Sequence, residues 1–128
     1  MMLKNFRHLT LGFVMAFAVL THSAVSMAAQ QKAKIVLQVS DNDPAKWNLA
    51  LNNARNAQDD LGKDNIDIEI VVYGPGIHML RMEATTATRV TQAIKSGISI
   101  VACENTMTAQ KINKADMHED RKSTRLNS

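Results

Sequence analysis

Residues 34–44 have the sequence Lys-Ile-Val-Leu-Gln-Val-Ser-Asp-Asn-Asp-Pro, and this stretch decides the fold. Its first six residues form an apolar, β-branched run, which is typical of a strand buried on both faces. Ser40–Asp43 is a turn cluster, after which Asp43 is expected to cap a helix with Pro44 at its first position. A strand followed directly by a helix is the repeating unit of α/β folds.

The helix predicted after Pro44 is amphipathic. Its apolar stripe, at spacings of three and four residues, consists of Trp47, Ala50, Leu51, Ala54, Ala57 and Leu61. Gly62 follows the stripe and is expected to end the helix as its C′ glycine.

The strand–helix unit is predicted twice more. The second strand covers 66–73, is broken by Gly74-Pro75-Gly76 and is followed by a short helical turn at 77–80. A helix capped by Thr85 or Thr86 then runs to Gly97. The third strand covers 98–103, and Asn105 or Thr106 is expected to cap the next helix. This alternation predicts an α/β fold with a mostly parallel sheet and helices on its faces.

The N-terminus is typical of a cleavable signal peptide. Lys4 and Arg7 precede the apolar run 9–20, and Ser26-Met27-Ala28 fits the small-x-small cleavage rule. We expect cleavage after Ala28, with Ala29 as the alternative, so that residues 1–28 are removed. The run is shorter than the roughly 20 residues of a membrane span. The protein is therefore predicted to be exported, periplasmic in a Gram-negative organism, without stable membrane association after cleavage.

The C-terminal segment 119–128 is interpreted as an artefact. Residues 120–128 back-translate, codon by codon, into a common sequencing-library adapter read in frame. We expect this segment to be disordered and the genuine domain, 29–118, to be truncated.

The positive charge of the chain is concentrated in these two segments. The whole sequence has a formal net charge of +3. Without the signal peptide and residues 120–128 it carries ten Lys and Arg against eleven Asp and Glu, a net charge of about −1. Such a balance predicts no nucleic-acid binding.

Three segments are expected at the carboxyl edge of the sheet, where open α/β sheets bind ligands. They are Ser40–Asp43, Gly74–His78 and Cys103–Asn105. The residues predicted to form the edge of a pocket there are Asp41, Asn42, Gly74, Gly76 and Asn105.

Cys103, the one cysteine of the chain, is the main candidate for chemistry. It ends a strand just before a helix start, where amide groups favour a thiolate, although Glu104 opposes this effect. The alternative is a small buried residue without chemistry. His78 is a candidate acid, base or thiolate partner, or otherwise an exposed turn histidine. One cysteine and one histidine do not make a metal-ligand set, so no metal and no cofactor are predicted.

The sequence resembles the DsrE/DsrF-like family, in its exported branch. The resemblance rests on Ser40–Asp43, on Val72-Tyr73-Gly74-Pro75-Gly76 and above all on Val101-Ala102-Cys103-Glu104-Asn105-Thr106-Met107. It implies a three-layer α/β/α sandwich, assembly as homo-oligomers, and sulfur donor and acceptor proteins as partners. It also implies that Cys103 accepts sulfane sulfur as a persulfide, with His78 and Glu104 as candidate neighbours.

Three functions stay open at this point. The first is a persulfide carrier in sulfur relay, sulfurtransferase-like at most, with Cys103 as acceptor. The second is a non-catalytic oligomeric module that binds a small anion or a partner chain. The third is a thiol-redox protein that forms an intermolecular disulfide through Cys103.

Overall fold

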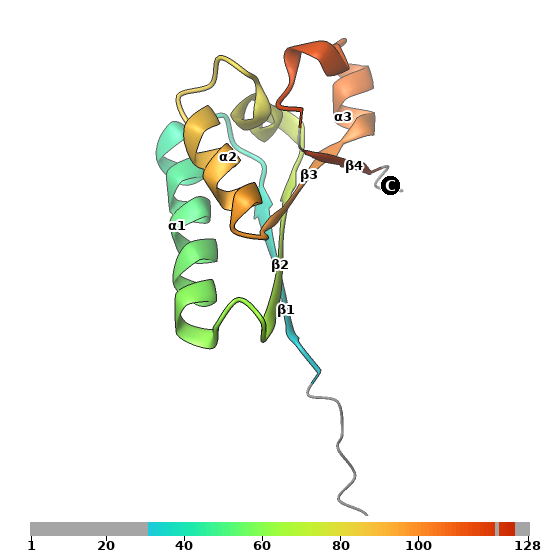
Figure 1. Ribbon diagram of the computed structural model, residues 1–128. Coiled ribbons are helices and arrows are strands. Elements are labelled where there is room, and N and C mark those ends of the chain that lie inside the picture. Colours follow the sequence, from blue (N-terminus) through green and yellow to red (C-terminus); the bar gives the residue numbers. More distant parts are fainter. Residues whose placement is uncertain (1–30, 120, 125–128) are drawn as a thin grey trace, which may run out of the picture.

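The computed structural model describes residues 31–119 and 121–124, which form a parallel sheet with helices packed against it (Figure 1). The strands are β1 (Ala33–Val39), β2 (Ile66–Val72), β3 (Ser99–Cys103) and β4 (Lys122–Thr124). The α-helices are α1 (Pro44–Leu61), α2 (Ala87–Lys95) and α3 (Glu104–Ala109). Two 3-10 helices are η1 (Gly74–Leu80) and η2 (Lys114–Asp116). The predicted signal peptide, 1–28, lies outside the described residues.

The predicted α/β class with a parallel sheet is confirmed. The strands lie in the order β1-β2-β3-β4, and each neighbouring pair is parallel. Figure 1 shows α1 and α2 on one face of the sheet and the short α3 on the other side, near the carboxyl ends of the strands. In the described residues, one helical layer is therefore complete and the second is reduced to α3.

Helix α1 begins and ends as predicted. The Asp43 carboxylate accepts a hydrogen bond from the backbone N–H of Ala45 at 2.8 Å, and Pro44 is the first helical residue. Gly62 has a φ of 81° and donates its N–H to the Gln58 carbonyl. The apolar stripe is buried from Trp47 onward, but Leu61, its last member, is exposed. The stripe is thus buried over fewer turns than predicted.

The main core lies between the sheet and the layer formed by α1 and α2. Most of its large, fully buried side chains come from β2, η1, α2 and β3, and include Ile70, Val72, Ile77, Leu80, Val90 and Ile100. Since η1 contributes to this core, the predicted helical turn after Gly76 is an integral part of the fold.

The prediction that the first strand is buried on both faces is wrong. Val36 is 62% exposed, and Lys34 and Gln38 on the same face of β1 are exposed too. The reason is that β1 is the outermost strand of the described sheet, and no described helix covers its outer face. An apolar run of this kind does not distinguish an inner strand from an edge strand.

The prediction that 119–128 is disordered is wrong for Lys122–Thr124, which forms β4 beside β3. Lys122 lies opposite Val101, and Thr124 lies opposite Cys103. A strand edge offers unpaired backbone groups with which a short extended segment can pair, whatever its side chains. The origin of this segment as an adapter sequence stays a prediction.

None of the helices in the described residues is both long enough and apolar enough to cross a membrane.

Candidate functional site at the carboxyl edge of the sheet

The three predicted segments meet at the carboxyl edge of the sheet. The backbone N–H of Gly76 donates to the Ser40 carbonyl at 3.0 Å, which joins the loops after β1 and β2. The N–H of Gly74 donates to the hydroxyl of Thr106 in α3, also at 3.0 Å. The Gln110 side-chain amide donates to the Gly74 carbonyl at 3.1 Å. The loop after β2 is therefore held between the loop after β1 and the helix after β3.

Gly76 is placed where no other residue fits. A Cβ atom at this position would lie 2.4 Å from the carbonyl oxygen of Val39 and 2.8 Å from its carbon. Because these are backbone atoms, they cannot rotate away as a side chain can. The N–H groups of Gly74 and Gly76 both have acceptors within the protein. These two amides are therefore used to hold the edge together rather than presented to an anion.

Cys103 is the last residue of β3, and it is buried, with 4% of its surface exposed. Side chains alternate along a strand, so Cys103 and Val101 lie on one face while Ala102 lies on the other. Ala102 belongs to the main core, whereas Cys103 does not. The thiol is thus on the face of the sheet away from α1 and α2.

The helix after Cys103 begins earlier than predicted. It starts at Glu104, with Cys103 in the N-cap position and without a side-chain cap, and it has six residues. The predicted cap Thr106 instead lies inside the helix, where its hydroxyl accepts the N–H of Gly74. This long-range partner explains why the hydroxyl is not used for capping.

Glu104 and His78 each have a partner close by. The Glu104 carboxylate accepts a hydrogen bond from the Lys114 ammonium at 3.0 Å, which ties α3 to η2. His78 accepts at Nδ1 from the Nε of Arg81 at 3.0 Å. The Glu104 contact therefore joins two segments, whereas the His78 contact is local to the end of η1. Lys114 also partly balances the negative charge beside Cys103.

Of the other residues predicted to form the edge of the pocket, Asp41 makes contacts within the fold, whereas Asn42 and Asn105 are exposed. The Asp41 carbonyl accepts the indole N–H of Trp47 at 2.6 Å, and the Asp41 carboxylate pairs with Lys46 at 3.0 Å. Asn42 and Asn105 are exposed at the same edge. Asp41 thus fixes the start of α1, while the two asparagines remain accessible. Within the described ranges, no three His, Cys, Asp or Glu side chains come close enough to hold a metal ion.

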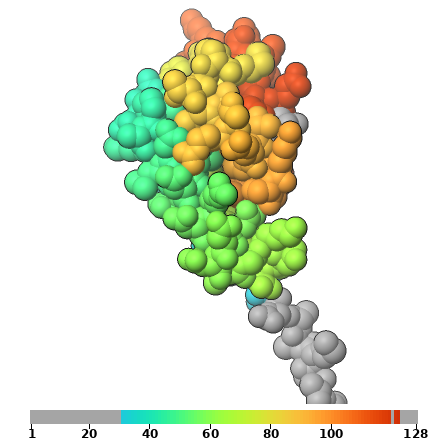
Figure 2. All heavy atoms as spheres, turned by 60° about the vertical axis from the view of Figure 1, so that its left-hand side comes forward, coloured from blue at the N-terminus to red at the C-terminus, as the bar shows by residue number. Residues whose placement is uncertain are grey.

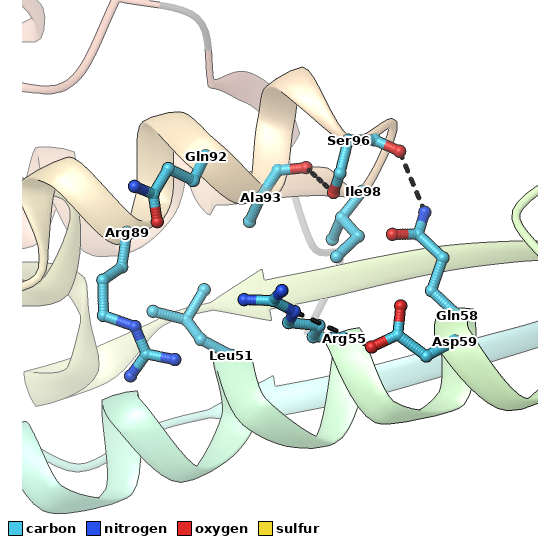
Figure 3. A pocket seen from close by; sticks show the side chains of 9 residues that line it. All are labelled: Leu51, Arg55, Gln58, Asp59, Arg89, Gln92, Ala93, Ser96 and Ile98. Atoms are coloured by element: carbon cyan, nitrogen blue, oxygen red, sulfur yellow. Dashed lines mark hydrogen bonds and ion pairs between the residues drawn. The ribbon is translucent and has the colours of Figure 1, made fainter.

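A groove lies between α1 and α2, away from the carboxyl edge of the sheet, and none of its residues was predicted to form a site. Figure 2 shows the face on which these helices lie side by side, and Figure 3 shows the groove between them, with a volume of about 470 Å³. Arg55 of α1 and Arg89 of α2 both line it. The signal in the sequence was an arginine in each of two helices predicted to cover the sheet, but their proximity depends on how the helices pack.

The comparisons with known proteins show similarity to solved structures but no family. No protein-family model matches the chain, and the curated proteins give no significant match. Among solved structures, the chain is similar to MTH1491, a protein of unknown function from Methanobacterium thermoautotrophicum. The TM-score is 0.69 with 26% sequence identity, over 73% of this chain and 82% of MTH1491. The similarity supports the α/β fold and carries no activity, because the function of MTH1491 is itself unknown.

Proposed function

We propose that this protein is an exported, DsrE-like persulfide carrier in which Cys103 accepts and releases sulfane sulfur. The observation that carries the proposal is the position of Cys103 at the carboxyl end of β3. Ligand sites of open parallel α/β sheets lie at this edge. The sequence around Cys103 is also the part of the chain that most resembles the family.

The transfer needs only a thiolate and a sulfane-sulfur donor. With thiosulfate as donor, the Cys103 thiolate attacks the outer sulfur, the donor's S–S bond breaks, and sulfite leaves with the electron pair. Cys103 then carries a persulfide. In the second step the thiolate of an acceptor protein attacks the outer sulfur of this persulfide and releases the Cys103 thiolate. Charge and electrons balance in both steps without an added oxidant.

The surroundings of Cys103 set one condition on this chemistry. Since the residue is almost fully buried, a donor reaches the sulfur only when the carboxyl edge opens locally. Two contacts that hold this edge together are the Gly74–Thr106 hydrogen bond and the exposed Glu104–Lys114 pair. Exposed ion pairs contribute little to stability, so the second contact is a weak barrier.

The experiment is intact-mass measurement of the mature protein after incubation with thiosulfate or polysulfide. We expect a gain of one or more sulfur atoms that reductant removes and that Cys103→Ser lacks. A failure to gain sulfur, while urea-unfolded protein is alkylated at Cys103, would exclude the carrier function. A covalent dimer in place of a sulfur adduct would support the thiol-redox alternative.

The burial of Cys103 also favours a second candidate, a non-catalytic binding module. A cysteine at 4% exposure is often a packing residue. In that case the carboxyl edge binds a small anion or a partner chain, and Cys103→Ser leaves binding intact. The mass experiment separates the two, because a module of this kind gains no sulfur.

We also propose that the protein assembles as a homo-oligomer. The support is the exposed outer face of β1, where Val36 is an exposed large apolar residue on an edge strand. An apolar sheet face that no described helix covers is a surface that a second copy of the chain can bury. Size-exclusion chromatography with light scattering tests this, and Val36→Lys is expected to shift an oligomer toward monomer. A monomer at all concentrations would contradict the proposal.

A further inference from the structure

We propose that the groove between α1 and α2 binds a small organic oxyanion, a carboxylate or phosphate attached to a compact apolar body. The site is independent of Cys103 and goes beyond the proposed persulfide function. Ile98 lines the groove and immediately precedes β3, whereas Cys103 ends that strand. The two sites are thus at opposite ends of β3.

Arg89 supplies a fixed positive charge. Its guanidinium donates to the side-chain carbonyl oxygens of Asn48 and Asn52, which lie one turn apart on α1. Both acceptors are neutral, so they hold the guanidinium in place without neutralising it. A guanidinium has five N–H donors, and these contacts use two nitrogens, leaving donors for an anion.

Arg55 supplies a second and more adaptable charge. Figure 3 shows its guanidinium in the groove, pointing along it in the direction of Arg89. Its side chain is 76% exposed, and its Nε lies 3.7 Å from the carboxylate of Asp59. An exposed ion pair of this length is weak. A bound oxyanion can therefore replace Asp59 as the partner of Arg55 at little cost.

The groove has an apolar floor, while Gln58, Asp59, Gln92 and Ser96 add polar groups to its lining. Its inner wall consists of three buried apolar residues, Leu51 of α1, Ala93 of α2 and Ile98 just before β3. The Gln58 side chain bridges the helices at one end by donating to the Ser96 carbonyl at 2.9 Å (Figure 3). The Arg89 contacts with α1 bridge the other end. The volume of about 470 Å³ lies in the usual range of small-molecule sites.

These features select the chemical class of the ligand. A guanidinium binds carboxylate and phosphate oxygens in a bidentate manner, and the apolar wall adds affinity for a ring or a branched chain. A neutral compound of the same shape lacks the charged contact. Since residues 29–119 have a net charge of about −1, attraction of an anion has to come from the local pair of arginines.

The test is isothermal titration calorimetry of the mature protein with benzoate, phenyl phosphate and the neutral analogue benzyl alcohol. Benzoate and phenyl phosphate distinguish a carboxylate from a phosphate ligand. We expect saturable binding of at least one of the two anions, weakened by salt, and none of benzyl alcohol. Arg55→Gln and Arg89→Gln are each expected to weaken binding by about tenfold, because a charge-assisted hydrogen bond is lost.

The controls are Lys63→Gln, which removes an exposed charge outside the groove, and Cys103→Ser. Both are expected to bind the anion as the unmodified protein does. Arg89→Gln also loses the hydrogen bonds to Asn48 and Asn52, so thermal unfolding is used to check that this variant is folded. Arg55→Gln changes an exposed side chain, so it tests the proposal even if Arg89→Gln unfolds. Absence of binding for both anions, or equal affinity in Arg55→Gln, overturns the proposal. Neither result bears on sulfur transfer, because sulfur transfer is measured by the mass that the protein gains at Cys103.

Discussion

The hydroxyl of Thr106 accepts a hydrogen bond from the backbone N–H of Gly74 at 3.0 Å, although the two residues are 32 positions apart. This contact joins the loop after β2 to the helix after Cys103. Replacing Thr106 with valine leaves the partly buried N–H of Gly74 without its acceptor. We expect Thr106→Val to lower the free energy of unfolding by about 1 kcal/mol in urea denaturation. Thr108→Val, an exposed change in the same helix, serves as the control; equal stability of the two variants would contradict the role of Thr106.

Gly76→Ala and Gly97→Ala separate a steric from a conformational requirement. The added methyl at Gly76 meets the Val39 carbonyl at 2.4 Å, whereas at Gly97 it meets nothing within 4 Å but has to adopt a φ of 97°. We expect a loss of about 3 kcal/mol for Gly76→Ala, because the backbone has to shift. The expected loss for Gly97→Ala is about 1 kcal/mol. Thermal and urea unfolding measure both, and a milder effect at Gly76 than at Gly97 would refute the close approach.

Trp47→Phe tests the contact between the first helix and the first loop. The buried Trp47 indole donates to the Asp41 carbonyl at 2.6 Å, and phenylalanine retains the apolar packing but not the donor. We expect a loss of about 2 kcal/mol, measured by circular dichroism because this tryptophan is the single one in the chain. Leu49→Ala, an exposed change in the same helix, is expected to stay within about 0.5 kcal/mol. A larger loss for Leu49→Ala than for Trp47→Phe would contradict the assignment of Trp47 to the buried face of α1 and Leu49 to its exposed face.

Two truncations test how much the C-terminal segment contributes. Ending the chain after Glu119 removes β4, a three-residue strand, and is expected to cost no more than about 1 kcal/mol. Ending it after Asp116 also removes Met117, which is fully buried in the main core, and is expected to cost about 2–5 kcal/mol. The free energy of unfolding of each truncated protein is measured in urea and compared with that of the full chain. A large loss from the first truncation would show that β4 is a necessary part of the domain.

The burial of Cys103 predicts slow alkylation of the folded protein. At 4% exposure, reaction with iodoacetamide requires local opening of the carboxyl edge. We expect the folded protein to react at least about tenfold more slowly than the urea-unfolded chain. Thr106→Val is expected to raise the rate, because it loosens one of the contacts that close the edge. Equal rates for folded and unfolded protein would mean that the thiol is accessible without opening.

Much of the local structure could be predicted from short stretches of sequence. Asp43 and Pro44 predicted the start of α1, and Gly62 its end, because capping involves residues a few positions apart. The helix start after Cys103 was predicted two or three residues too late, and one of the expected caps, Thr106, has a partner in another loop. The exposure of Val36 could not be predicted either, because an apolar strand has the same composition at the edge of a sheet as at its centre.

The sequence by itself determined the kind and order of the elements from β1 to α3, since hydrophobic periodicity and caps act over a few residues. Only the tertiary structure decided which of their residues meet. Packing of the parallel strands brought Gly76 against Val39 and Gly74 against Thr106 at the edge that contains Cys103. Packing of α1 beside α2 brought Arg55 and Arg89 to one groove. Such contacts join residues that are tens of positions apart, and they depend on strand order and helix placement, which local patterns do not encode.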